Sequence, residues 1–350
     1  MHAINDDIAA VFGLVFNILA TWLALHTRVP ELREYRRITC QMCFIDLFLL
    51  VCTFAVKPLK IVQFGNEYLI VNGYFRKIHA HYGYAAFTVW FFALFFSITS
   101  VPVVFVFRCV RLCYNRSFAM KHQMILLAVS ALASLAFCVL AYWVYYINGQ
   151  EGLYLAEALP AYAHDDDGQV RACGMLFPRT IYSYSIVTSV TFLSVGSYSI
   201  IIFCSLRIYW HVKTAPKAIS KRAHDVQKQL NRLLTIHATI PLFSAVMPST
   251  VLVVAMTFDT VDFTKFTVLV TMFFSWIPAG NAMSVVFFVK AYRQQLLSMI
   301  CRVCKRRRIP SNNSVTNWGA IPGSASPGRR MTLANLPTIS QSMYPTMSSK

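Results

Sequence analysis

The chain has 350 residues, of which 57% are hydrophobic and only 13% are charged. No soluble globular domain of this length needs so apolar a composition, so a soluble enzyme or a soluble binding domain is excluded. The net charge of +18 could suggest a nucleic-acid partner, but its distribution along the chain follows the positive-inside rule of membrane proteins instead.

Seven apolar segments are long enough to cross a bilayer as helices of about 20 residues. The predicted spans are 8–26, 38–56, 82–107, 124–147, 181–206, 233–257 and 266–289. The sequence therefore predicts an all-α membrane protein, a seven-transmembrane helix bundle. No cleavable signal is predicted, because residues 1–7 contain Asp6 and Asp7 but no Lys or Arg, so the first span is expected to act as both signal and anchor.

Lys and Arg are divided unequally between the two sets of connections. One set, formed by 27–37, 108–123, 207–232 and everything from residue 290, holds 25 of the 32 basic residues, and the other set holds seven. This bias predicts an extracellular N-terminus at 1–7 and a cytosolic C-terminus. The connection 57–81 is the weakest point of the assignment, since it carries four basic residues on the side expected to be poor in them, namely Lys57, Lys60, Arg76 and Lys77.

The outer connections are short apart from 148–180, so an external ligand is expected to be small and to enter the bundle itself. Cys173 is the only cysteine clearly placed in an outer connection, and Cys52 is the one candidate disulfide partner. After the seventh span, 290–308 is predicted to form a basic amphipathic juxtamembrane helix. Residues 309–350 are rich in Ser, Thr, Asn, Pro and Gly, which predicts a disordered cytoplasmic tail.

Two cysteines on the juxtamembrane segment, Cys301 and Cys304, lie beside the basic run that ends at Arg308. This position favours S-palmitoylation. Unmodified thiols that face lipid or protein are an equal alternative.

Asp46 lies within the second predicted span, where a carboxylate is costly unless it faces the bundle interior or has a partner. Asn17 in the first span and Asn281 in the seventh are at depths where they could share a water or ion site with Asp46. The simpler alternative is that Asp46 is protonated and hydrogen-bonded, without a further role.

Prolines interrupt the last two spans. Pro241 and Pro248 lie seven residues apart on nearly the same face of the sixth span, and Pro278 with Asn281 after it predicts a bend near the middle of the seventh. These helices are expected to act as hinges, although prolines also occur in membrane helices without such a role.

Aromatic residues form a stripe near the outer end of the third span, with Tyr84, Phe87 and Trp90 at helical spacing. Such a stripe is more often packing than a ligand contact.

At the inner end of the same span, Arg108 and Arg111 lie three residues apart on one helical face. The inner basic segments could simply attract anionic lipid, at about 1 kcal/mol per basic residue, or could bind a cytoplasmic partner.

Two motifs carry a resemblance to a known family. The sixth span opens with QKQLNRLLTIHATIPLFSAVMP, and the seventh closes with PAGNAMSVVFFVKAYR. Together with seven spans and an outer N-terminus, these motifs resemble the nematode serpentine chemoreceptors, in the superfamily that contains classes d, h and str. Those receptors are similar to rhodopsin-like G-protein-coupled receptors at low sequence similarity. The resemblance covers residues 8 to about 300.

The chain departs from the family pattern at three places. Asn281, Tyr292 and Arg293 match the seventh-span motif, but Ala282 stands where a second proline is expected. Phe107, not an acidic residue, precedes the Arg that ends the third span. Cys173 lacks its usual partner at the top of that span.

The resemblance implies a receptor of the plasma membrane, in sensory cilia, that detects a small external chemical and activates a heterotrimeric G protein by movement of the kinked sixth and seventh helices. The expected ligand-binding residues are Tyr84, Phe87, Trp90, Met256 and Trp276. The expected G-protein-facing residues are Arg108, Arg111, Lys221, Arg222, Tyr292 and Arg293. No cofactor, metal site or catalytic residue is expected, and the oligomeric state stays open.

Other functional classes remain as alternatives. A seven-span channel or transporter could use Asp46 and broken helices, but the chain shows no inverted repeat and no second intramembrane carboxylate. A membrane enzyme is less favoured, because the HxxxH, HExxH and GxSxG patterns are absent. A trafficking role within a receptor complex is the third alternative.

Overall fold

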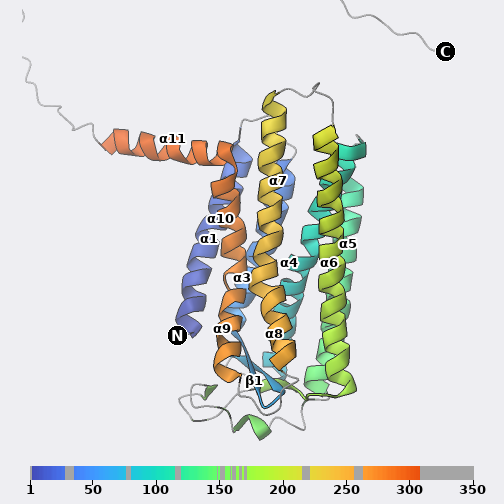
Figure 1. Cartoon of the computed structure of the whole chain (residues 1–350). Helices are drawn as coiled ribbons and strands as arrows, with labels where there is room; N and C mark the ends of the chain where they lie inside the picture. The colour runs from blue at the N-terminus through green and yellow to red at the C-terminus, as the bar shows by residue number, and fades with distance from the viewer. Residues whose placement is uncertain are drawn as a thin grey trace, which may run out of the picture. The chain divides into compact units, whose positions relative to one another are not determined.

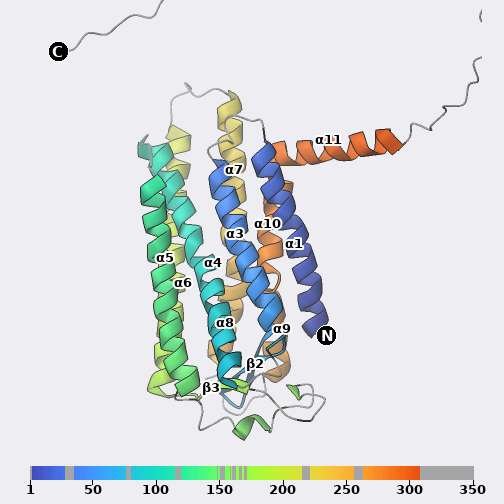
Figure 2. The same cartoon turned by 180° about the vertical axis from the view of Figure 1, so that it is seen from behind.

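The structure is a computed structural model, and it describes residues 2–27, 35–75, 80–114, 120–147, 149, 154–157, 159, 163–164, 168, 172–214, 221–255 and 263–307. Residues 1–303 form one compact unit and residues 304–350 a second. In the first unit, long helices run side by side and short strands gather at one end of them (Figure 1). Seen from behind, α1, α3, α4 and α5 lie along the near face (Figure 2). The predicted tail, 309–350, lies outside the described residues.

Within the described residues, six helical segments are each long and apolar enough to cross a bilayer without a sharp break. They are α1 (His2–His26), α3 (Tyr35–Val56), α4 (Ala80–Tyr114), α5 (Met120–Ala141) with the π-helical turn η1 (Tyr142–Ile147), α6 (Ile181–Thr214), and α7 (Lys221–Pro241) with the π-helical turn η4 (Leu242–Val246) and α8 (Met247–Ala255). The predicted helix bundle is therefore present. Hydropathy finds these helices because hydrocarbon requires each segment to satisfy its own backbone hydrogen bonds.

The seventh span consists of two helices, α9 (Thr264–Phe274) and α10 (Ile277–Phe288), bent by 42°. The break falls at Ser275 and Trp276, just before Pro278. Proline suits the first turn of a helix, where its missing N–H would have no intrahelical acceptor. The bend thus lies in the region where the sequence places it, a few residues before the proline.

Several helices run past the predicted limits of the spans on the side opposite the strands. α4 continues from residue 107 to Tyr114, α6 continues from residue 206 to Thr214, and α7 begins at Lys221 instead of residue 233. Apolar segments end where charged residues begin, but helical hydrogen bonding continues through charged residues into water. On the same side, α11 (Lys290–Arg307) begins after Val289, whose backbone is extended.

A three-stranded antiparallel sheet covers the other end of the bundle, and the sequence did not predict it. Its strands are β1 (Pro58–Gln63), β2 (Asn66–Val71) and β3 (Ala172–Leu176), in the order β1-β2-β3. β1 and β2 are joined by a turn at Phe64 and Gly65, both with positive φ, as in the two-residue turns that match the twist of a hairpin. β3 pairs with β2 across about 100 residues of sequence, with a register shift between Leu69 and Ile70.

The strands are buried on both faces. One group of side chains, including Leu69 and Val71, joins the aromatic core below the sheet, and another, including Ile61 and Met175, packs under the outer loop. The sheet is thus a lid that belongs to the core of the bundle. Two basic residues of the connection 57–81 have ion-pair partners. Lys57, just before β1, pairs with Asp7 at 2.7 Å, and Lys60 on β1 pairs with Glu67.

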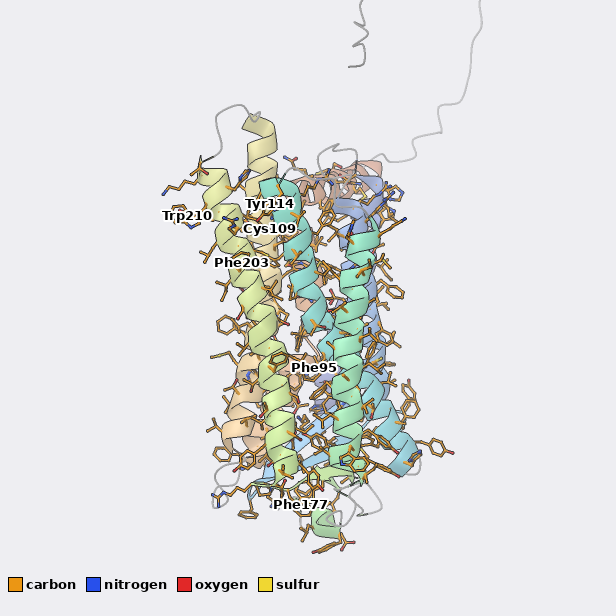
Figure 3. All side chains as sticks on the ribbon, turned by 90° about the vertical axis from the view of Figure 1, so that its right-hand side faces the viewer. Phe95, Cys109, Tyr114, Phe177, Phe203 and Trp210 are labelled. Atoms are coloured by element: carbon orange, nitrogen blue, oxygen red, sulfur yellow. The ribbon has the colours of Figure 1, made fainter. Side chains whose placement is uncertain are left out.

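The interior of the bundle contains two hydrophobic clusters along its length. The cluster next to the lid is rich in aromatic side chains, as in the close contact between the rings of Phe95 and Phe137, whose centroids are 4.1 Å apart. The cluster at the opposite end is more aliphatic and includes Phe105, Leu233 and Tyr292. Figure 3 shows Phe95 on α4 between the helices, and Phe203 and Trp210 on α6, where both are exposed on the outer surface.

Cys173 lies buried in β3, and its thiol is 3.4 Å from the carbonyl oxygen of Leu69. It is a free cysteine, as is Cys52, so the candidate disulfide between them is not formed. A Cβ atom placed on Gly83, near the outer end of α4, would be 3.7 Å from the Cβ atom of Cys173. That separation falls in the disulfide range of roughly 3.5–4.5 Å. Gly83 therefore occupies the place where a disulfide partner for Cys173 would stand.

The variant Gly83→Cys is expected to form a disulfide with Cys173 and to stabilise the protein by about 2–4 kcal/mol. The added side chain meets only ordinary contacts, and the bond would tie β3 to α4. Non-reducing mass spectrometry and the thermal unfolding midpoint measure the two effects, with Gly83→Ser as the control. In the wild type, burial raises the pKa of Cys173 to about 12, so slow alkylation at neutral pH is expected. A variant that stays fully reduced would contradict the placement of β3.

Candidate functional site

A cavity of about 50 Å³ lies under the lid, inside the bundle. This volume is enough for a few water molecules at roughly 10–15 Å³ each. Its wall comes from the lid, from α4, from α5 with η1, from α6, and from the outer parts of the sixth and seventh spans. The lining side chains are mostly aromatic or aliphatic: Trp90, Phe91, Leu94, Phe95, Phe137, Leu176, Ile186, Val187, Val190, Val253 and Phe274, with Lys60, Glu67, Tyr145 and Ser249 as the polar members.

Three of the polar side chains meet at the lid end of the cavity. Lys60 on β1, which is half-buried, forms an ion pair with the buried Glu67 on β2, and the hydroxyl of Tyr145 on η1 donates to Oε2 of Glu67 at 2.8 Å. The Lys60 ammonium also lies 5.7 Å from the centre of the Phe91 ring, within the range of a cation–π contact. This group, Lys60, Glu67 and Tyr145, is called the polar triad below.

Sequence reasoning missed the polar triad because it treated Lys60 only as a charge on the wrong side of the membrane. The strand register explains the pair: Lys60 is opposite Leu69, so Glu67 is its diagonal neighbour across the hairpin. The signal in the sequence was the Phe64-Gly65 turn between two short apolar runs, with a basic residue before it and an acidic residue after it.

The predicted ligand-binding residues are not gathered in one place. Trp90 lines the cavity, with its indole N–H bonded to Thr53 on α3 at 3.1 Å. Phe87 packs behind it, with ring centroids 5.2 Å apart, and Tyr84 donates to the carbonyl oxygen of Ala141 at 2.6 Å. Both are buried away from the cavity as packing residues. Met256 lies outside the described residues.

Trp276, also predicted to contact a ligand, does not line this cavity. Its indole N–H donates to Oδ1 of Asn5 on α1 at 3.0 Å, and its ring lies 6.1 Å from that of Phe12. Trp276 therefore faces α1, and Phe274, two residues earlier, faces the cavity instead. The break in the helix between these residues sets which side each one faces, and sequence spacing alone does not.

The lid-side end of α1 holds the break in the seventh span. Ser275 donates to Oδ1 of Asp6 at 2.7 Å, and His2 lies 3.0 Å from the other carboxylate oxygen. Asn5 donates to the carbonyl oxygen of Met272 at 3.3 Å. The contact of Asn5 satisfies a backbone carbonyl that the interrupted helix leaves without an intrahelical partner, and the Asp6 contact ties the Ser275 side chain at the break to α1.

Deeper in the bundle, the predicted polar residues form two separate contacts. Asn281 on α10 donates to Oδ1 of Asp46 on α3 at 2.9 Å, and Ser284 donates to the carbonyl oxygen of Asn281 at 2.6 Å. Asn17 instead donates to the carbonyl oxygens of Gly13 at 2.8 Å and of Pro278 at 3.2 Å. The sequence placed Asn17, Asp46 and Asn281 at one depth. In the structure, Asn17 and Asp46 each form a hydrogen bond with α10, the helix that carries Asn281.

The prolines of the sixth span have different surroundings. Pro241 is buried at the end of α7 and is followed directly by the π-helical turn η4, whereas Pro248 lies half-buried at the start of α8. A π-helical turn shifts the helical phase relative to a regular α-helix. Pro102, which the sequence analysis did not single out, is buried inside α4.

At the opposite end of the bundle, the predicted G-protein-facing residues differ in exposure. Arg108 is 1% exposed, so it does not face solvent at this end, while Arg111 is half-buried and Arg293 is exposed. Tyr292 packs into the inner cluster, and burial raises its pKa to about 12. Lys221 opens α7, and Arg222 follows it, but the side chains of both lie outside the described residues.

The two predicted palmitoylation sites lie on α11. Cys301 is exposed, and the side chain of Cys304 is not among those described. Among the described residues, no group of three or more His, Cys, Asp and Glu side chains could hold a metal ion.

Residues 3–298 match the family described as serpentine type 7TM GPCR chemoreceptor Srd. The chain belongs to this family. The resemblance to nematode serpentine chemoreceptors is thereby confirmed. The chain is also 32% identical to the G-protein coupled receptor str-217 of Caenorhabditis elegans over 146 residues, a match that covers 39% of this chain and 41% of that relative. The match to str-217 thus spans less than half the length of either protein.

Among solved structures, the chain resembles squid rhodopsin with a TM-score of 0.61 over 89% of this chain and 87% of that one. The sequence identity is 13%, so this likeness concerns the fold alone. The Srd chain is therefore a multi-pass membrane protein with a rhodopsin-like seven-transmembrane fold.

The variant Asn17→Ala is expected to lower the free energy of unfolding by about 0.6–1.7 kcal/mol, the usual size of an interhelical hydrogen bond in a membrane. It removes the contact between α1 and the first turn of α10. Thermal unfolding of the purified receptor measures the change. The matched control is Thr250→Ala, because the exposed Thr250 hydroxyl bonds only to its own helix. Equal stability of both variants would show that the contact does not hold the bend.

Proposed function

We propose that this Srd chain is a chemoreceptor that binds a small external molecule in the cavity under the lid and activates a heterotrimeric G protein at the opposite end. One observation carries the proposal: the cavity is lined by Ser249 and Val253 on α8 and by Phe274 on α9. These residues lie on the lid side of η4 and of the 42° bend. A ligand there would contact α8 and α9. The π-helical turn η4 separates α8 from α7, and the 42° break separates α9 from α10.

The mechanism requires a ligand to bind one arrangement of these helices better than another, since a ligand with equal affinity for both shifts nothing. Movement of α8 and α9 would be passed on to α7 and α10 through η4 and through the break. α7 and α10 pack against one another beyond these points, with Leu233, Val285 and Val286 in one cluster. Pro241, Pro248, Pro278 and Asn281 are proposed as hinge residues, with Asn17 and Asp46 as the contacts that hold α10.

The lid side is proposed to be extracellular and the opposite side cytosolic. The distribution of 25 of the 32 basic residues supports this orientation. The long basic ends of α4, α6 and α7 would then extend into the cytosol, where Arg111, Lys221, Arg222 and Arg293 are proposed to contact the G protein. Arg108 and Tyr292 would join that surface only after a helix movement that exposes them, because both are buried here.

The cellular setting is proposed from family membership. Chemoreceptors of this type would act in the plasma membrane of sensory cilia. Palmitoyl chains on Cys301 and Cys304 would anchor α11 at the inner surface. The family and the fold favour the receptor over a channel or transporter.

The variant Arg111→Ala is expected to weaken ligand-evoked G-protein activation about tenfold, which corresponds to about 1.4 kcal/mol, without changing ligand binding. Arg111 is chosen over Arg108 because replacing the buried Arg108 with Ala would leave a cavity. A loss of folded protein could then not be distinguished from a loss of G-protein activation. A second-messenger reporter in heterologous cells, screened with small volatile and water-soluble compounds, measures activation. Lys265→Ala, an exposed change on the lid side, is the control. Equal responses from both variants would contradict the inner-face assignment.

A further inference from the structure

The polar triad carries no net charge, although it lies inside an aromatic cavity. The Lys60 ammonium is balanced by the Glu67 carboxylate, and the Tyr145 hydroxyl hydrogen-bonds to that carboxylate. Among the described residues that line the cavity, these are the only ionisable side chains. A ligand with a net charge would therefore add an unbalanced ion to a largely apolar space, and burying an ion without a counter-charge is strongly unfavourable.

The hydrogen bonds of the triad also bear on which polar group of a ligand can bind beside it. Oε2 of Glu67 accepts a hydrogen bond from Tyr145, and Oε1 lies against the Lys60 ammonium in the ion pair. An ammonium has three N–H donors, and the contact with Glu67 uses one of them. The triad thus offers the remaining donors of Lys60 to a ligand. A ligand group that accepts a hydrogen bond, such as a carbonyl oxygen, fits this arrangement.

The rest of the cavity favours an apolar ligand body. The rings of Trp90, Phe91 and Phe274 surround it, and aliphatic side chains of α6 complete the wall. We infer that the ligand of this site is a small neutral molecule with a hydrogen-bond acceptor, such as a ketone, an ester or an ether, on a compact hydrocarbon skeleton. This inference rests on the proposed function, because it assigns the cavity to the ligand.

Three compounds with one skeleton and different charge test the inference: cyclohexanone, cyclohexanecarboxylate and cyclohexylamine. Each is larger than the open space of about 50 Å³, so its binding requires the lining side chains to move apart. The ligand-induced rise in the thermal unfolding midpoint of the purified full-length receptor gives an apparent dissociation constant without any G protein. The wild type is expected to bind cyclohexanone at least about tenfold more tightly than the carboxylate or the amine. A wild type that binds either ion as tightly as the ketone, or that does not bind the ketone, overturns the inference.

Changes in the triad are expected to change the preferred charge. In Glu67→Gln the Lys60 charge has no counter-charge, so the carboxylate should become the preferred compound, with a gain of about tenfold or more. In Lys60→Gln the Glu67 charge is unbalanced, so the amine should gain in the same way. Lys57→Gln, which alters the basic residue just before β1 that pairs with Asp7 outside the cavity, should keep the wild-type preference. Unchanged preferences in both triad variants overturn the inference.

A variant with an unbalanced buried charge can fail to fold, and the double variant Lys60→Gln/Glu67→Gln guards against this. It leaves no unpaired charge, so it is expected to fold and to prefer the ketone, as the wild type does. A double variant that prefers either ion contradicts the charge argument. The binding assay also separates the two proposals: a receptor that binds the ketone but activates no G protein in cells supports the ligand class and refutes the proposed function.

Discussion

A helix that is interrupted inside hydrocarbon must find partners for the polar groups it exposes, and this constraint organises the bundle. The seventh span breaks at Ser275 and Trp276, and each side of the break is held by another helix. α1 supplies Asp6, Asn5 and Asn17, and α3 supplies Asp46. The first and second spans are thereby fixed to the seventh, which explains why polar residues occur in otherwise apolar helices.

The same break places the two sides of the seventh span in different surroundings. Phe274, before it, faces the cavity under the lid, and Trp276, after it, faces α1. The sixth span changes in a similar way at η4, with the cavity-lining Ser249 and Val253 on the lid side. A molecule in the cavity therefore meets helical segments that can move relative to their continuations. The lid supplies the only charges described in that cavity, and they neutralise one another.

Hydropathy and charge were enough to predict the helices, because a membrane span is a local property of about 20 residues. The bend near Pro278 was predictable for the same reason. The lid was not, since β1 and β2 are short and β3 joins them from about 100 residues away. The pocket was only partly predictable. Trp90, singled out by its helical stripe, lines the cavity, but Tyr84, Phe87 and Trp276 face other partners, because the rotation of each helix depends on neighbours that spacing does not reveal.

The central claim is that occupation of the cavity moves the far ends of the sixth and seventh spans. The most direct measurement is the distance between fluorescent non-natural residues placed at Arg37 on α3 and Lys228 on α7, two exposed positions at the end opposite the lid. The account predicts that saturating cyclohexanone shifts this distance distribution in the membrane-embedded receptor, and that a G protein shifts it further. A distribution that stays the same with ketone bound and G protein present would contradict the account.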